Sequence, residues 1–161
     1  MVSPELIRTF LQEVSDPEIP VLTIIDLGVV QQIYEAEGEW VIELTPTYSG
    51  CPAMQQIEAD VLTKLQEKGI NNARIQHVLS PAWTTDWISE EGRHKLRLYG
   101  IAPPVNEPDK SILFAEAPVV PCPKCQSPET KMISLFGSTA CKAHYQCLSC
   151  KEPFDYFKCL K

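Results

Sequence analysis

Two Cys-x-x-Cys pairs give the sequence its most specific chemical pattern. The first pair is Cys122 and Cys125, and the second pair, Cys147 and Cys150, is separated from it by 21 residues. Two tight turns that each present two thiolates can surround one tetrahedral Zn²⁺, and the separation is close to that of zinc ribbons. We therefore expect a structural zinc ion at these four residues, with rubredoxin-like iron as the alternative metal.

Three further residues of ligand type lie near these pairs without a recognisable spacing: Cys141, His144 and Cys159. Each could be an additional ligand, an iron–sulfur contact or a packed side chain, and the sequence leaves these alternatives open. The chain has seven cysteines in all. An odd number that includes two Cys-x-x-Cys pairs favours a metal site in a reducing compartment over a disulfide framework. We therefore expect a cytoplasmic protein.

The remaining cysteine, Cys51, lies where a helix is predicted to begin. It belongs to the stretch TPTYSGCP at residues 45–52, which closes a predicted strand and turns at Gly50. Apolar residues recur at helical spacing over residues 53–68, and Pro52 suits the first helical position. Cys51 is then the expected N-cap, where free backbone N–H groups and the helix dipole favour a thiolate. It could be a nucleophile, a soft-metal ligand or a redox site, or an inert apolar cap.

The elements around Cys51 predict an α+β fold. Helical periodicity covers residues 3–14, 53–68 and 88–99, and strand composition covers residues 29–35, 40–45 and 73–79. Strands that alternate with helices in this order favour a small two-layer α/β domain, with a mixed sheet and helices, over residues 1–101. A C-terminal zinc ribbon follows it.

Two acidic loops precede the Cys51 stretch: DPEIP at residues 16–20 and DLG at residues 26–28. Each proline disfavours helical geometry in the residue before it, and Asp16 can accept hydrogen bonds from the backbone ahead, so the first loop is predicted to be a turn. Turn-making is the simpler interpretation of the carboxylates of Asp16 and Asp26. A functional role is the alternative.

Proline density and charge divide the rest of the chain. Residues 102–118 are predicted to be a stiff connector, because seven of the fourteen prolines fall between Pro103 and Pro128. Residues 119–161 form the expected zinc-ribbon module, which is too small to fold without metal.

The net charge of −7 is unevenly placed along the sequence. Residues 1–118 carry 8 basic and 18 acidic side chains, and residues 119–161 carry 6 and 3. An acidic body argues against nucleic-acid binding. No apolar run approaches the roughly 20 residues of a membrane span, so no membrane contact is expected.

The acidic loops and the Cys51 stretch, in this order, resemble the iron–sulfur assembly family that includes SufT and the eukaryotic cytosolic targeting factor. The resemblance implies that Cys51 is the reactive residue and that Asp16 and Asp26 are the matching acidic positions. It also implies a transient iron–sulfur cluster as a second cofactor beside zinc.

Three more motifs resemble the PaaD family of bacterial phenylacetate degradation: WTTDW at residues 83–87, YGIAPP at residues 99–104 and the tail EPFDYFKC at residues 152–159. This resemblance spans nearly the whole chain. It implies an accessory component of the phenylacetyl-CoA 1,2-epoxidase system, in which a separate di-iron oxygenase performs the chemistry. A flavin and [2Fe-2S] reductase supplies the electrons.

Three functions fit these observations. In the first, the chain matures or targets iron–sulfur clusters, Cys51 transiently holds a cluster or its client, and the ribbon binds the partner, with the reductase as the expected client. In the second, the chain is a permanent structural or electron-transfer subunit of the epoxidase. In the third, Cys51 is the nucleophile of an enzyme, but only His77 and His94 lie in the first domain as candidate bases, and neither has a motif around it.

We favour the first function. The sequence holds no nucleophile elbow, phosphate-binding loop, zincin helix or Rossmann fingerprint, so we expect no enzymatic activity of the chain by itself. A homodimer is left open.

Overall fold

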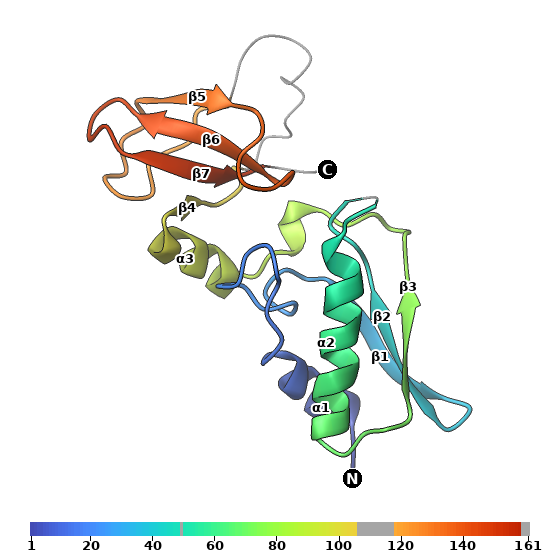
Figure 1. Ribbon diagram of the computed structural model, residues 1–161. Helices are drawn as coiled ribbons and strands as arrows, with labels where there is room; N and C mark the ends of the chain where they lie inside the picture. Colours follow the sequence, from blue (N-terminus) through green and yellow to red (C-terminus); the bar gives the residue numbers. More distant parts are fainter. Residues whose placement is uncertain (49, 106–117, 159–161) are drawn as a thin grey trace. The chain divides into compact units, whose positions relative to one another are not determined.

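The computed structural model describes residues 1–48, 50–105 and 118–158. It forms two compact units, Met1–Gly92 and Arg93–Lys161 (Figure 1). The division falls inside helix α3 (Glu90–Tyr99), earlier than the expected domain end at residue 101. Most of the expected connector, at residues 106–117, lies outside the described residues.

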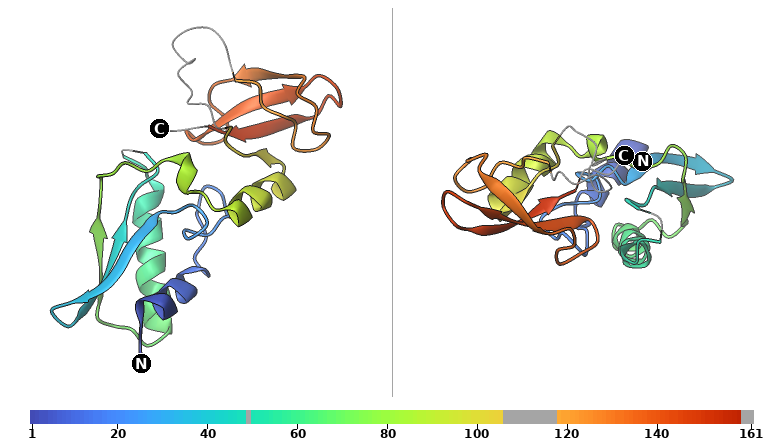
Figure 2. Two further views of the ribbon diagram at one scale, coloured as in Figure 1. Left: turned by 180° about the vertical axis from the view of Figure 1, so that it is seen from behind. Right: turned by 90° about the horizontal axis from the view of Figure 1, so that it is seen from above.

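The first unit is built on a mixed three-stranded sheet in the order β1-β2-β3. Strands β1 (Val30–Ala36) and β2 (Glu39–Leu44) form an antiparallel hairpin, and β3 (Ala73–His77) pairs with β2 in parallel. Parallel neighbours need a crossover connection. Helix α2 (Ala53–Glu67) provides it and lies against the sheet in every view (Figures 1 and 2).

Local sequence signals explain the first helix and the hairpin. Helix α1 (Pro4–Leu11) begins as predicted, because the Ser3 hydroxyl accepts a hydrogen bond from the Leu6 N–H at 3.2 Å. The hairpin turns through Glu37 and Gly38, with φ values of 54° and 80°. Left-handed residues at both positions give the turn the twist that antiparallel strands need.

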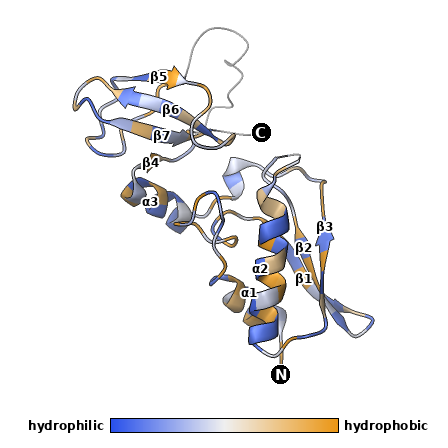
Figure 3. Cartoon of the chain, in the orientation of Figure 1, coloured by the Kyte–Doolittle hydropathy of each residue, from blue (hydrophilic) through white to orange (hydrophobic). Residues whose placement is uncertain are grey.

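The core of the first unit lies between its helices and its sheet. Helix α1 contributes Ile7 and Leu11, and helix α2 contributes Ile57, Val61 and Leu65, all essentially buried. Apolar and polar bands alternate along α2 (Figure 3). This alternation is the amphipathic pattern that predicted the helix. No described helix is long and apolar enough to cross a membrane.

The second unit contains α3 and a four-stranded sheet in the order β4-β7-β6-β5. The strands are β4 (Ile101–Ala102), β5 (Thr130–Ser134), β6 (Lys142–Cys147) and β7 (Pro153–Phe157). The short strand β4 is parallel to β7, and the other pairs are antiparallel.

Aromatic side chains form the centre of the second unit. The Tyr145 ring stacks on Phe154 with centroids 5.8 Å apart and meets the edge of Tyr156 at 5.5 Å. Cys122 and Cys147 belong to the same buried cluster. The core of this unit is therefore continuous with two of the four paired cysteines. The fold is α+β, as predicted, with the paired cysteines in the C-terminal part.

Candidate metal centre and the Cys51 turn

The structure brings the four paired cysteines together as one group. Their sulfur atoms all lie within 4.8 Å of one another. Cys122 Sγ is 3.8 Å from Cys150 Sγ, and Cys125 Sγ is 3.5 Å from Cys147 Sγ. A tetrahedral ion with Zn–S bonds of about 2.3 Å places its sulfurs about 3.8 Å apart, so the group fits a four-thiolate metal site.

Two similar turns present these thiol pairs. In the first, the Gln126 N–H donates to the Cys122 carbonyl at 2.9 Å, and Gln126 is left-handed with φ of 64°. In the second, the Cys150 N–H points at Cys147 Sγ at 3.5 Å, and Lys151 is left-handed with φ of 66°. In each turn, the residue after the second cysteine thus folds the chain back.

A serine pair links the two turns. The hydroxyl oxygens of Ser127 and Ser149 are 2.8 Å apart, and the Ser149 hydroxyl also donates to Glu129 Oε2 at 3.3 Å. We did not predict this link from the sequence, although each serine lies within two residues of a paired cysteine. It helps to hold the two thiol pairs in register.

The four thiols cannot all ionise without a cation between them. The N–H groups of Cys150 and Ser149 favour the Cys147 thiolate and lower the pKa of Cys147 to about 6, against the effect of desolvation. The Glu152 N–H favours the thiolate of Cys150, but desolvation and the three neighbouring cysteines outweigh it and raise the pKa of Cys150 to about 12. A divalent metal would remove this conflict.

The other candidate ligands are placed elsewhere or are not described. The Cys141 sulfur is buried 3.0 Å from Thr139 Oγ1, and His144 Nδ1 is 3.5 Å from Asp155 Oδ1. Neither belongs to the four-sulfur group. Cys159 lies outside the described residues.

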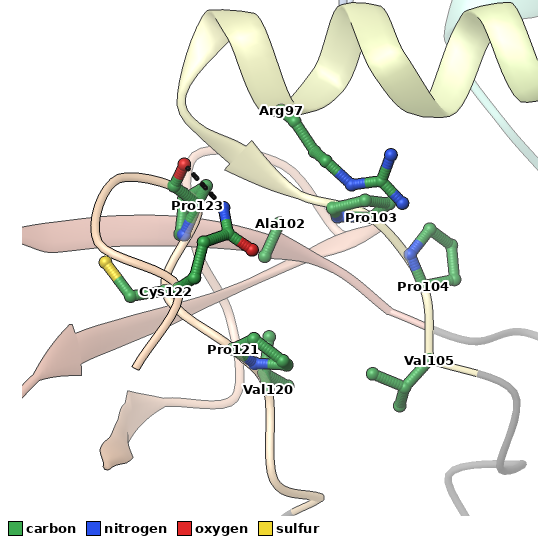
Figure 4. A pocket seen from close by; sticks show the side chains of 10 residues that line it. Arg97, Ala102, Pro103, Pro104, Val105, Val120, Pro121, Cys122 and Pro123 are labelled. Carbon is green, nitrogen blue, oxygen red and sulfur yellow. Dashed lines mark hydrogen bonds between the residues drawn. The ribbon is translucent and has the colours of Figure 1, made fainter. Parts of the chain in front are cut away.

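A pocket of about 210 Å³ adjoins the first cysteine turn (Figure 4). Arg97 and several prolines line it, and the Cys122 sulfur points away from Arg97, Pro103 and Pro104. The pocket therefore does not open onto the metal-type sulfurs.

The structure corrects the predicted position of Cys51. Helix α2 has Pro52 as its N-cap residue, with φ of −67° and ψ of −21°, and no side-chain capping bond. The Cys51 N–H donates to the Tyr48 carbonyl, and the Met54 N–H donates to the Cys51 carbonyl, both at 3.3 Å. Because Pro52 already has helical geometry, Cys51 lies one residue before the cap, in a turn, and is half-buried.

Asp16 shapes the loop that contacts this turn. Its carboxylate is 7% exposed and accepts hydrogen bonds from the N–H groups of Glu18 and Ile19, both at 2.8 Å. The predicted bonding to the backbone ahead is therefore present. The Tyr48 hydroxyl lies 3.4 Å from Glu18 Oε1 as a hydrogen-bond donor. A chain of contacts thus runs from Asp16 through Glu18 and Tyr48 to Cys51.

Asp26 organises the second acidic loop and ties it to a distant segment. Its carboxylate accepts from the Thr23 N–H at 3.1 Å and from the Ser89 hydroxyl at 3.3 Å. In the next residues, the Leu27 carbonyl accepts a hydrogen bond from buried Trp83 Nε1 at 2.8 Å. The tryptophan-rich stretch therefore packs back on this loop, as its composition predicted.

The last position of that loop requires glycine. Gly28 has φ of +72°, and a Cβ built there would lie 2.6 Å from the Trp87 carbonyl oxygen and 2.8 Å from Trp87 Cβ. A side chain would therefore be strained by its backbone conformation and would also displace the Trp87 backbone.

The comparisons with known proteins place these units in families. The model of the PaaD zinc beta ribbon domain matches residues 106–158, and that of the iron–sulfur cluster assembly protein family matches residues 4–75. A protein of Escherichia coli (strain K12), described as a subunit of 1,2-phenylacetyl-CoA epoxidase, is 48% identical over 96% of this chain and 92% of its own length. The chain belongs to the PaaD family. Its C-terminal part is a zinc-ribbon domain with a four-cysteine metal site.

Two further matches concern only the first part of this PaaD-family chain. An Fe-S protein maturation auxiliary factor of Porphyromonas gingivalis is 36% identical over 57% of this chain and 89% of its own length. The crystal structure of a domain of unknown function, DUF59, from Bacillus anthracis has a TM-score of 0.54 at 29% identity and covers 58% of this chain and 90% of its own. The maturation-factor family therefore shares the part that contains Cys51.

We predict that Gly28→Ala lowers the free energy of unfolding of the first unit by about 3 kcal/mol, because it combines a left-handed φ with a backbone clash. Gly38→Ala is the matched control, since Gly38 has φ of +80° with no atom within 4 Å of a built Cβ. Its expected cost is about 1 kcal/mol. Urea denaturation followed by tryptophan fluorescence measures both. Equal costs would contradict the contact with Trp87.

We also predict that Cys147→Ser removes the bound metal and unfolds the second sheet, because a ribbon of this size depends on metal for folding. NMR signals of Tyr145 and Tyr156 should lose their dispersion. Tryptophan fluorescence should persist, since all three tryptophans lie in residues 1–92. Cys141→Ser is the control and should keep its metal. Retention of metal by the Cys147 variant, or its loss from the Cys141 variant, would contradict the assignment.

Proposed function

We propose that this protein is an accessory component of a phenylacetyl-CoA 1,2-epoxidase system and that it matures or targets an iron–sulfur cluster for a partner. The expected client is the flavin and [2Fe-2S] reductase. The observation that carries the proposal is the division of the chain. The part with Cys51 matches the iron–sulfur assembly family, and a ribbon particular to the PaaD family follows it.

This division supports different roles for the two parts. The maturation factor from Porphyromonas gingivalis matches 57% of this chain, and the epoxidase subunit from Escherichia coli matches 96%. The general chemistry is then the task of the shared N-terminal part. The ribbon, which carries more basic than acidic side chains, serves to recognise the partner.

The position of Cys51 suits a transient ligand. Its thiol is half-buried in a turn directly before α2, so a soft metal can reach it while the Tyr48 contact keeps the turn in place. Thiolate sulfur is the ligand that iron–sulfur clusters use. In this proposal, Asp16 and Asp26 act as positioning residues, because their carboxylates organise the two loops that surround this region.

The surroundings favour transfer over covalent catalysis. A cysteine nucleophile normally has a base within hydrogen-bond reach. His77 Nε2 is 2.7 Å from Glu58 Oε1, so this ring already has a carboxylate partner. His94 is exposed on α3.

We further propose that the metal of the ribbon is a structural Zn²⁺. All four sulfurs point to one centre, and Cys122 and Cys147 are buried in the aromatic core. A site with four protein ligands has no open position for a substrate, which is typical of structural zinc. The ion would therefore stabilise the ribbon, and cluster chemistry would take place at Cys51.

The test is to produce the reductase together with this protein and to measure its [2Fe-2S] content and electron-transfer activity. We predict that Cys51→Ala lowers both severalfold, because the transient sulfur ligand is lost. Thr47→Ala is the matched control, since it alters the same stretch without removing the thiol. The prediction fails if the reductase made with the Cys51 variant carries a full cluster complement and full activity.

A further inference from the structure

An open pocket of about 410 Å³ lies in the second unit, on one face of its sheet. Lys142, His144 and Asp155 line it, and His144 is directly opposite Asp155 in the β6–β7 ladder. Side chains alternate between the two faces of a strand. These three residues therefore share the face opposite to that of Tyr145 and Tyr156, which belong to the aromatic core.

Lys142 is the unusual member of this pocket. The residue is only 6% exposed, yet no hydrogen bond or ion pair of its ammonium is found among the described parts of the chain. Lys158 shows how the same unit treats another buried lysine. It is 5% exposed, and its ammonium donates to the Leu135 carbonyl at 3.0 Å and lies 4.7 Å from the centre of the Phe136 ring. A buried charge without a partner is costly, so Lys142 calls for an anion.

The neighbouring acidic residue limits the charge of that anion. Asp155 Oδ1 lies 3.5 Å from His144 Nδ1, so the carboxylate is partnered by the imidazole and remains part of the pocket wall. A second negative charge on the ligand would be repelled by Asp155. A ligand with a single negative charge therefore suits this pocket better than a phosphate dianion.

The rest of the wall describes the body of the ligand. Tyr99, Ile101, Pro153 and Phe154 supply apolar surface, and Ser138 adds a hydroxyl. Ligand pockets commonly combine apolar walls with a few polar groups that fix orientation.

We propose that this pocket binds a small organic monocarboxylate, with its carboxylate paired to the Lys142 ammonium and its apolar body against Tyr99 and Phe154. The site is separate from the four cysteines and from Cys51. It does not depend on the proposed role in cluster maturation.

The test is an NMR titration of the full, metal-loaded chain with benzoate as the probe. Benzamide is the neutral comparison of nearly the same shape, and it needs no variant of the protein. We expect benzoate to shift the signals of Lys142 and His144 and to bind at least about tenfold more tightly than benzamide, which corresponds to about 1.4 kcal/mol.

Two lysine variants provide the second arm. Lys142→Met should weaken benzoate binding by about tenfold or more, and it keeps the length of the buried stem. Lys131→Met removes the same charge from an exposed position on β5 and should change the affinity by less than about twofold. Spectra of both variants without ligand check that the sheet is intact.

Three results would overturn the proposal. One is equal binding of benzoate and benzamide, and another is unchanged benzoate affinity in Lys142→Met. The third is tighter binding of inorganic phosphate than of benzoate at this pocket, which would make it a general anion site. Absence of any shift at Lys142 and His144 would also count against it.

Discussion

The second unit depends on the attraction between four cysteine sulfurs and a metal ion. Sulfurs within 4.8 Å of one another raise the pKa of Cys150 to about 12 while that of Cys147 falls to about 6, so the thiols cannot all become thiolates unless a cation joins them. Cys122 and Cys147 are also part of the aromatic core. The ion therefore joins the two cysteine turns and the sheet into one folding unit.

The first unit has no comparable covalent centre among its described residues and relies on hydrogen bonds between loops. Asp16 fixes the backbone of its own loop, Glu18 of that loop meets Tyr48, and the Tyr48 carbonyl accepts from the Cys51 N–H. Trp83 secures the second acidic loop in the same way. These contacts give Cys51 a defined position without enclosing it, which is what a ligand that must receive and release its cargo requires.

Local signals in the sequence predicted what local interactions determine. The Ser3 cap, the Glu37–Gly38 turn and the periodicity of α2 each depend on neighbours a few residues away, and each is present in the structure. The pairing of β4 with β7 was not predictable, because its partners are far apart in the sequence. The buried ammonium of Lys142 is likewise a tertiary feature, since only burial in the folded sheet makes its charge costly.

The most direct measurement of the central claim is the metal and sulfide content, with the visible spectrum, of anaerobically purified wild-type protein and Cys51→Ala after each is offered iron and sulfide. We predict one zinc ion per chain in both proteins and iron–sulfur absorbance in the wild type alone. Equal iron–sulfur content in the two proteins, or iron in place of zinc at the four cysteines, would contradict a separate structural zinc site and a cluster-handling Cys51.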